Sequence, residues 1–148
     1  MTADEMWRAS GLEGSYEAWE YGDAPDKLAR LTLEGRKTGT ASAYEVYGKE
    51  GEALPAPGEY SVILSSLGDA VCIIKTTEVS VVPFEEVTAS HAAAEGEGDL
   101  SLDYWRRVHE EFFRRELEPY GIPFTPRTPV VCERFIKVYP ESEEEKRR

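Results

Sequence analysis

The sequence has few of the residues that form cross-links or structural metal sites. It contains two cysteines, Cys72 and Cys132, and two histidines, His91 and His109. The cysteines lie in separate apolar segments rather than in a Cys-x-x-Cys pair, and the histidines are too few to complete a zinc site with them. We therefore expect two buried, reduced thiols, no bound metal and no other cofactor.

Positive charge is also scarce. The 148 residues include 17 lysines and arginines against 29 acidic residues, which gives a formal net charge of −12. An acidic protein repels a nucleic-acid backbone at long range, so this balance argues against broad phosphate contact. A local basic groove would still be compatible with it.

Long apolar runs are missing as well. No segment approaches the roughly 20 apolar residues that cross a bilayer, and the start, MTADEMWRASG, lacks the apolar core of a secretion signal. A composition of 41% hydrophobic and 31% charged residues is typical of one folded, soluble domain. We expect a cytoplasmic protein without a membrane partner, and a solvated charged tail at residues 141–148.

The first third of the chain is predicted to be helical. The expected helices are one after a capping box at Thr2 and Glu5, one over residues 15–22, and one from Asp23 or Asp26 to Gly35. Gly35 is expected to close its helix because glycine tolerates the left-handed conformation found there.

Strands are predicted for most of the remainder. Alternating or β-branched segments occupy residues 38–47, 60–66, 70–82 and 129–139. Helical segments at 84–95 and 101–117 interrupt the strands. Ser101 is the expected N-cap of the helix at 101–117. The apolar face of that helix includes His109, which we expect to be a packed residue. The pattern predicts an α+β fold in which four or five strands form a compact barrel or strongly curved sheet.

The stretch LEGRKTGTAS, residues 33–42, contains the first candidate site. It differs from a phosphate-binding P-loop because a helix precedes Gly35 and a strand follows it, so we reject a nucleotide hydrolase. Lys37 and Thr40 would share one face only if the chain bends near Gly39. A desolvated lysine can act as the base that activates a threonine, but the residues alone favour the simpler interpretation, a solvated lysine and a strand threonine.

The second candidate site is SHAAAEGEGD. His91 and Glu95 are four residues apart, so on a helix they lie on one face. Two such ligands do not complete a metal site, and no Gly-x-Ser-x-Gly motif is present to organise a hydrolase triad.

The two sites, in this order, resemble the ASCH-domain family of the PUA-like superfamily. The resemblance covers about residues 24–139 and rests on LEGRKTGTAS, LPAPGEYSVIL, VCIIKTTEVSVVPFEEV, SHAAAEGEGDLSLDYWRRVHEEFF and VVCERFIKVY. It implies a small curved β-barrel of about five strands with flanking helices. It also implies a helical extension at 1–23, the ASCH domain at 24–140 and the tail at 141–148.

The resemblance extends to small bacterial ASCH proteins that remove the acetyl group from N4-acetylcytidine. It implies that Lys37, Thr40 and Glu95 are catalytic, with Lys37 activating Thr40 and Glu95 moving a proton. The implied substrate-binding residues are Arg36, Thr38, Ser42, Tyr44, His91 and Trp105. We expect a partly buried Lys37 within one hydrogen bond or one water of Thr40, with Tyr44 or Trp105 covering an aromatic ring.

The alternative is a protein that binds or cleaves single-stranded RNA, as other ASCH proteins do. A basic stripe would then consist of Arg36, Lys37, Arg106, Arg107, Arg114 and Arg115, with Tyr44 or Tyr47 stacking on bases. Neighbouring acids, Glu110, Glu111, Glu116 and Glu118, could instead neutralise the arginines as surface pairs. A nucleoside or single-stranded RNA is the expected partner, and the oligomeric state stays open.

Overall fold

One mixed sheet organises the protein, whose computed structural model describes residues 1–142. Its strands are β1 (Glu17–Trp19), β2 (Gly39–Ala43), β3 (Tyr60–Leu64), β4 (Ala70–Pro83) and β5 (Pro129–Tyr139). They are arranged in the order β1-β3-β4-β5-β2, where β1 is parallel to β3 and the other neighbours are antiparallel. The sheet is therefore open, with β1 and β2 as its two edges.

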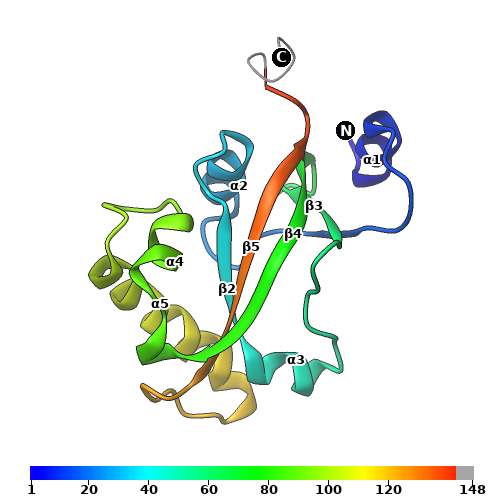
Figure 1. Cartoon of the computed structure of the whole chain (residues 1–148). Coiled ribbons are helices and arrows are strands. Elements are labelled where there is room, and N and C mark those ends of the chain that lie inside the picture. Colours follow the sequence, from blue (N-terminus) through cyan, green and yellow to red (C-terminus); the bar gives the residue numbers. More distant parts are fainter. Residues whose placement is uncertain (143–148) are drawn as a thin grey trace.

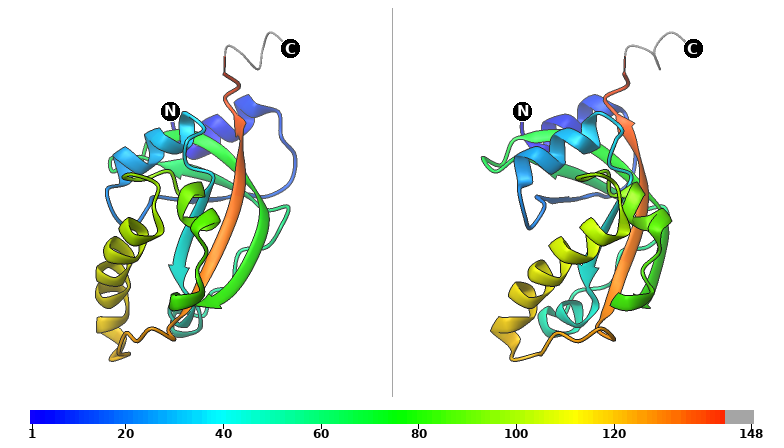
Figure 2. Two further views of the ribbon diagram at one scale, coloured as in Figure 1. Left: turned by 60° about the vertical axis from the view of Figure 1, so that its left-hand side comes forward. Right: turned by 90° about the vertical axis from the view of Figure 1, so that its left-hand side faces the viewer.

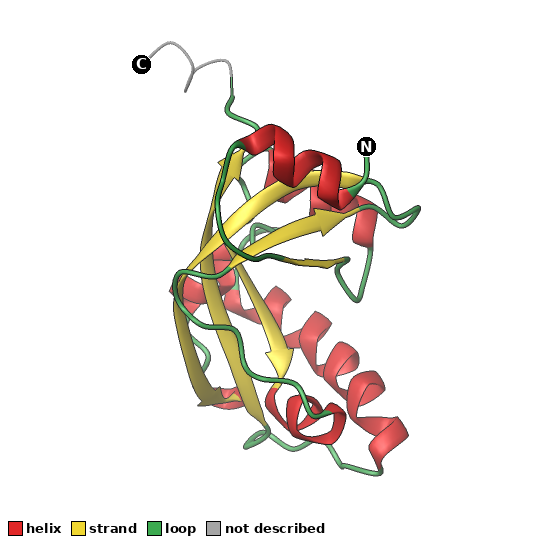
Figure 3. Cartoon of the chain, turned by 90° about the vertical axis from the view of Figure 1, so that its right-hand side faces the viewer, coloured by secondary structure: helices red, strands yellow, loops and turns green. Residues whose placement is uncertain are grey.

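Helices flank this sheet. They are α1 (Ala3–Ser10), α2 (Pro25–Leu33), α3 (Tyr44–Glu50), α4 (Ala89–Ala94) and α5 (Leu102–Leu117), with single 3₁₀ turns at Phe84–Glu86 and Glu118–Tyr120. Two irregularities in the pairing of β4 with β5 accompany a strong bend of the sheet, whose concave side faces α5 (Figures 2 and 3). The expected α+β class with a curved, barrel-like sheet of five strands is confirmed as a half-barrel.

Three groups of buried side chains hold the helices on the sheet. Trp105, Phe113 and Leu117 of α5 pack with residues of β2 and β5. Leu28 and Ala29 of α2 and, separately, residues of α1 pack against β3 and β4. The helices near the two ends of the sheet in Figure 1 are thus anchored by different clusters.

Several local predictions are confirmed. The capping box of Thr2 and Glu5 forms, Ser101 accepts the amide hydrogen bond of Tyr104 at the start of α5, and Gly35 has a φ of +80° just after α2. Both cysteines are buried and unpaired. Burial raises the pKa of each thiol to about 12, so neither is a reactive nucleophile.

Two secondary-structure predictions are wrong. Residues 15–22 are not helical, because Glu17–Trp19 pairs with β3 as a strand. The predicted strand 38–47 ends at Ala43, and α3 begins at Tyr44. A hydrogen bond of 2.7 Å between the hydroxyls of Ser42 and Tyr47 joins strand to helix across this turn. The predicted tail lies mostly outside the described residues, and the domain boundaries stay a prediction.

Candidate functional site

A buried carboxylate, Glu95, is the centre of the candidate site. It lies at the C-terminal end of α4, a helix that begins where the Thr88 hydroxyl accepts the amide hydrogen bond of His91. One turn of helix then separates His91 from Glu95, as their spacing predicts. The Glu95 side chain is only 2% exposed.

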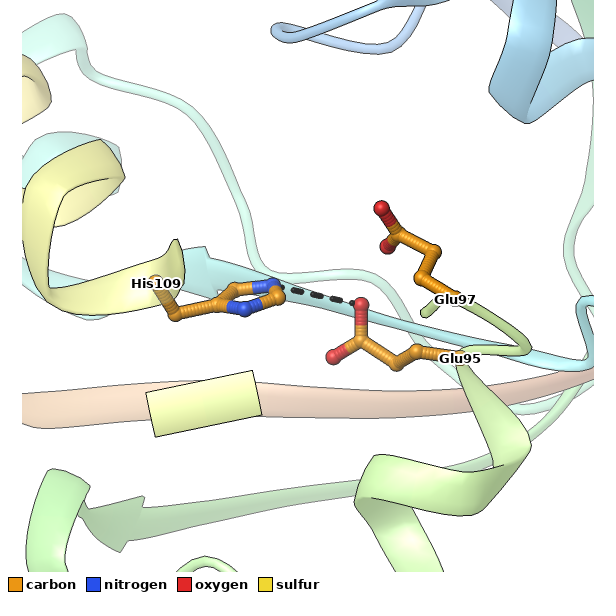
Figure 4. A group of neighbouring side chains, drawn as sticks. All are labelled: Glu95, Glu97 and His109. Atoms are coloured by element: carbon orange, nitrogen blue, oxygen red, sulfur yellow. Dashed lines mark ion pairs between the residues drawn. The ribbon is translucent and has the colours of Figure 1, made fainter. Parts of the chain in front are cut away.

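Four side chains direct nitrogen atoms at this carboxylate. Lys37 Nζ lies 3.2 Å from Oε1. His109 Nε2 lies 3.3 Å from the same oxygen (Figure 4). His91 Nε2 is 2.9 Å from Oε2, and the Trp105 indole N–H donates to Oε2 at 2.6 Å. Both oxygens are therefore satisfied without water, as a buried carboxylate requires.

Neighbouring groups fix the proton positions on both imidazole rings. Arg134 can only donate, and its Nε is 3.4 Å from Nδ1 of His91, so Nε2 of His91 carries the hydrogen that points to Glu95. His109 Nδ1 donates to the Trp105 carbonyl oxygen at 2.9 Å.

These donors keep Glu95 ionised. Burial opposes ionisation, but the charge of Lys37 and the hydrogen bonds from His109 and His91 outweigh it and hold the pKa of Glu95 well below its usual value. At neutral pH the site therefore contains a carboxylate surrounded by donors.

Lys37 is more deeply buried than predicted, since only 1% of the residue is exposed. Its ammonium group also lies 3.6 Å from Glu97 Oε2 and 5.2 Å from the centre of the Tyr21 ring. The segment that carries it is fixed to α4, because the Thr38 amide donates to the Ala94 carbonyl at 2.7 Å. Lys37 thus reaches Glu95 from the residues just before β2.

Thr40 lies beside this group, and of the two predicted links to Lys37, one hydrogen bond or one water, only the second stays a prediction. Lys37, Thr40 and Glu95 line one cavity of about 60 Å³, together with Tyr21 and His109. Among the hydrogen bonds of residues 1–142, none joins Lys37 to Thr40, because the ammonium instead pairs with the two glutamates. The cavity has room for a bridging water, which needs about 10–15 Å³.

A larger cavity adjoins the first one, and Thr40 is among the residues that line both. Its volume is about 800 Å³, and it extends between the two edge strands, from Glu17–Tyr21 to Thr40–Ala43. Thr40 and Tyr21 line both cavities. Ligand pockets commonly have volumes of about 300–1,000 Å³, so this one can hold a small molecule beside the buried ion pair.

The remaining predicted binding residues differ in their positions. Ser42 lines the large cavity, and His91 bonds to Glu95. Trp105 is 2% exposed and its indole N–H is bonded to Glu95, so its ring does not cover a ligand. The Thr38 hydroxyl bonds to the Ala94 carbonyl. Arg36 is exposed and Tyr44 is 43% exposed on α3, and neither lines the two cavities described.

Sequence reasoning missed four residues that face the site: Tyr21, Glu97, His109 and Glu133. His109 is packed as expected, with its ring stacked on Trp105 at a centroid distance of 4.2 Å, but it also points at Glu95. Its spacing of four from Trp105 was the available signal. No local pattern indicates Tyr21 or Glu133, because the fold alone brings them to the cavity.

Glu95, Glu97 and His109 form a group that could hold a metal ion, with ligand atoms within 4.8 Å of one another (Figure 4). Lys37 is 3.2 Å and 3.6 Å from the two carboxylates, so its positive charge already balances theirs. A divalent cation at this point would be repelled by that ammonium. The donor set fits an ion pair better than a metal.

The four arginines of α5 all make contacts within the described residues, and two of them pair with acids. Arg114 pairs with Glu110 at 3.3 Å, Arg115 pairs with Asp23 at 3.7 Å, and Arg106 donates to the Glu85 carbonyl. Arg107 lies over the Tyr104 ring. Surface pairing of this kind was expected, although Asp23 rather than a neighbouring glutamate is the partner of Arg115.

Comparison with known proteins assigns the fold and the family. An ASCH domain of Lactobacillus crispatus JV V101 is 30% identical, with a TM-score of 0.86 over 93% of this chain and 94% of its own. A protein of Enterococcus faecalis V583, described as DUF984, is 34% identical, with a TM-score of 0.82 over 97% and 91%. A hypothetical protein with 14% identity and a TM-score of 0.54, over 83% of this chain and 99% of its own, shares the fold alone.

No curated protein matches the sequence, so these relatives bring no named activity. Within the described residues, no helix has the length and apolar character needed to span a membrane. The sequence profile of the ASCH domain matches residues 17–139. The chain therefore belongs to the ASCH domain family.

Proposed function

We propose that the protein is an amidohydrolase that acts on an acylated cytidine or a related nucleoside. The main support is the position of Thr40, between the buried Lys37–Glu95 pair and the large cavity. A hydroxyl at this boundary can reach a ligand in the cavity while remaining close to groups that move protons.

The ion pair suggests an order for the proton transfers. In the reactive form Lys37 is the neutral amine, its proton having passed to solvent, and it takes the hydroxyl proton of Thr40 through a bridging water. Thr40 Oγ1 forms a bond to the amide carbon as the carbon–nitrogen bond breaks. The ammonium so formed passes this proton through Glu95, 3.2 Å away, to the departing nitrogen, which leaves as an amine and returns Lys37 to the neutral form.

The ester on Thr40 is then hydrolysed by the same groups. A water attacks the ester carbon and its proton passes to Lys37, while Glu95 again relays a proton, this time to the Thr40 oxygen. The products are a carboxylic acid and the free hydroxyl. The His91, His109 and Trp105 contacts hold Glu95 in one orientation throughout, which lowers the cost of reorganisation.

The alternative, binding or cleavage of single-stranded RNA, has less support. The large cavity has no lysine or arginine among its lining residues. The α5 arginines are engaged in the contacts described above. A polyanion would therefore meet repulsion at the site that best fits a ligand.

The test is to incubate the purified protein with N4-acetylcytidine and to follow the release of cytidine. Thr40→Val removes the hydroxyl at nearly constant shape and should lower kcat at least 100-fold. Lys37→Ala should have a similar effect. Thr77→Val is the matched control, because Thr77 is an exposed threonine of β4 outside both cavities. No turnover by the wild-type protein would exclude this substrate, and an active Thr40→Val would exclude the mechanism.

A further inference from the structure

The large cavity has an unusual charge distribution. Its lining includes six glutamates and neither lysine nor arginine. Five of these glutamates are exposed around the opening, but Glu133 is only 7% exposed. A ligand inside the cavity therefore meets negative charge at the rim and a single carboxyl group in the wall.

Glu133 is held by one hydrogen bond. The Thr76 hydroxyl donates to its Oε2 at 2.7 Å, and no ion pair involves the carboxyl group among the described residues. Burial, with the charges of Glu59 and Glu17, raises the pKa of Glu133, against the lowering effect of Thr76. A buried carboxyl without a cation normally gains hydrogen bonds from elsewhere, since it is costly to leave unsatisfied.

The sheet places Glu133 next to Thr40. The two residues are direct partners in the antiparallel pairing of β2 with β5. Side chains of direct partners lie on the same face, with Cβ atoms about 4.5–5.5 Å apart. A ligand group that binds the Glu133 carboxyl is thus presented to the Thr40 hydroxyl.

The other walls suit a flat, uncharged ring. Tyr21, Tyr47 and Phe112 contribute aromatic surface, and Ser42 with Tyr47 contributes hydroxyl groups. Aromatic faces bind heteroaromatic rings without requiring charge, and the rim of glutamates disfavours phosphate.

We propose that this cavity binds the uncharged base of a nucleoside and that Glu133 selects a cytosine-type ring by accepting a hydrogen bond from its exocyclic N–H. The inference rests on the proposed function, because it takes the nucleoside from there. In an N4-acylated cytosine the same nitrogen carries the acyl group. Holding its N–H at Glu133 places the amide carbon beside Thr40.

The first experiment measures binding to the wild-type protein by calorimetry. Cytidine should bind at least 10-fold more tightly than pyrimidin-2-one ribonucleoside, which lacks only the exocyclic amino group, because a site built for a hydrogen bond rejects the analogue without it. Cytidine 5′-monophosphate should bind at least 5-fold more weakly than cytidine at low salt, and the difference should narrow as salt is added. Equal binding of the first pair, or tighter binding of the monophosphate, would overturn the inference.

Variants then assign the effect to Glu133. Glu133→Leu should bind cytidine and the analogue equally, whereas Glu111→Gln, an exposed glutamate of α5 outside the cavity, should keep the wild-type preference. A preference that persists in folded Glu133→Leu contradicts the role of Glu133. If that variant does not fold, the wild-type ligand series still decides whether the exocyclic N–H is read.

Hydrolysis of N4-acetylcytidine by the same preparations separates this inference from the proposed function. Turnover without any preference for cytidine over the analogue would support the proposed amidohydrolase function and contradict the proposed selection of the base by Glu133. Preference without turnover would support base selection and remove the amidohydrolase. No binding of any nucleoside would remove the inference.

Discussion

Replacing Lys37 by methionine should destabilise the protein strongly, because it leaves Glu95 ionised in the core without its lysine partner. The two groups are 3.2 Å apart, and their side chains are 1% and 2% exposed. With an effective dielectric constant of about 20, Coulomb's law gives roughly 5 kcal/mol for this pair. Removing one member of a buried pair typically costs about 3–5 kcal/mol. At this chain length that corresponds to a fall in Tm of roughly 9–15 °C.

Chemical unfolding at pH 7, followed by tryptophan fluorescence, measures this cost. Trp105 bonds to Glu95 and so reports on the site itself. Lys49→Met is the matched control; Lys49 is exposed on α3, and its loss should change the free energy of unfolding by less than about 0.5 kcal/mol.

The double variant Lys37→Met/Glu95→Gln tests the cause. A neutral glutamine can accept from Trp105 and donate to His109, so the double variant should be at least about 1 kcal/mol more stable than Lys37→Met alone. Wild-type stability in Lys37→Met would refute the reasoning. So would a double variant no more stable than the single one, since the loss would then not come from an unpaired charge.

Three further predictions concern pH, the backbone and RNA. The pKa of Glu95 in the folded protein lies below its ordinary value of 4.5, so the ionised carboxylate stabilises the fold above pH 4.5, and this contribution is lost as the pH falls through the folded pKa. The Tm of Glu95→Gln should therefore depend less on pH below 4.5 than the Tm of the wild type. Parallel plots of Tm against pH for the two proteins would contradict this. Gly96→Ala should lower the free energy of unfolding by at least about 2 kcal/mol, because a Cβ at this position, where φ is +72°, would overlap the Arg36 carbonyl oxygen. Gly51→Ala, with a φ of +68° and open space around the Cβ, should lower it by about 1 kcal/mol. Equal losses of stability in urea denaturation would argue against the close approach of Gly96 to Arg36. Single-stranded RNA should not shift the protein in gels at physiological salt, and a shift that weakens in Arg106→Ala would favour the RNA alternative instead.

The sequence alone was sufficient for much of the fold because its signals are local. The capping residues Thr2 and Ser101, the closing Gly35 and the β-branched runs of β3, β4 and β5 each act over a few residues. The failure at Glu17–Trp19 has the opposite origin. Three residues carry too little periodicity to indicate a strand, and their conformation is decided by pairing with β3, more than 40 positions away.

In the candidate site, too, the features set by local spacing could be predicted, and those set by tertiary contacts could not. His91 and Glu95 could be placed on one face because a helical turn joins them. The bonding of Lys37 to Glu95 rather than to Thr40 depends on how α4 docks against the start of β2, where Gly96 closely approaches the backbone of Arg36. Glu133 reaches the cavity only through the register of β5 with β2, and no spacing in the sequence encodes that register.

The open edge of the sheet has a consequence for how this family can diversify. In the described chain, the large cavity is bordered by β1 and β2, which share no ladder of backbone hydrogen bonds. Its width can therefore change, by substitutions or by a lengthened loop near Glu52–Pro55, without breaking any strand pairing. The proposed proton-transfer groups, Lys37 and Glu95, lie outside these two strands, in the residues before β2 and at the end of α4. Ligand size and reaction chemistry can thus evolve separately on one scaffold.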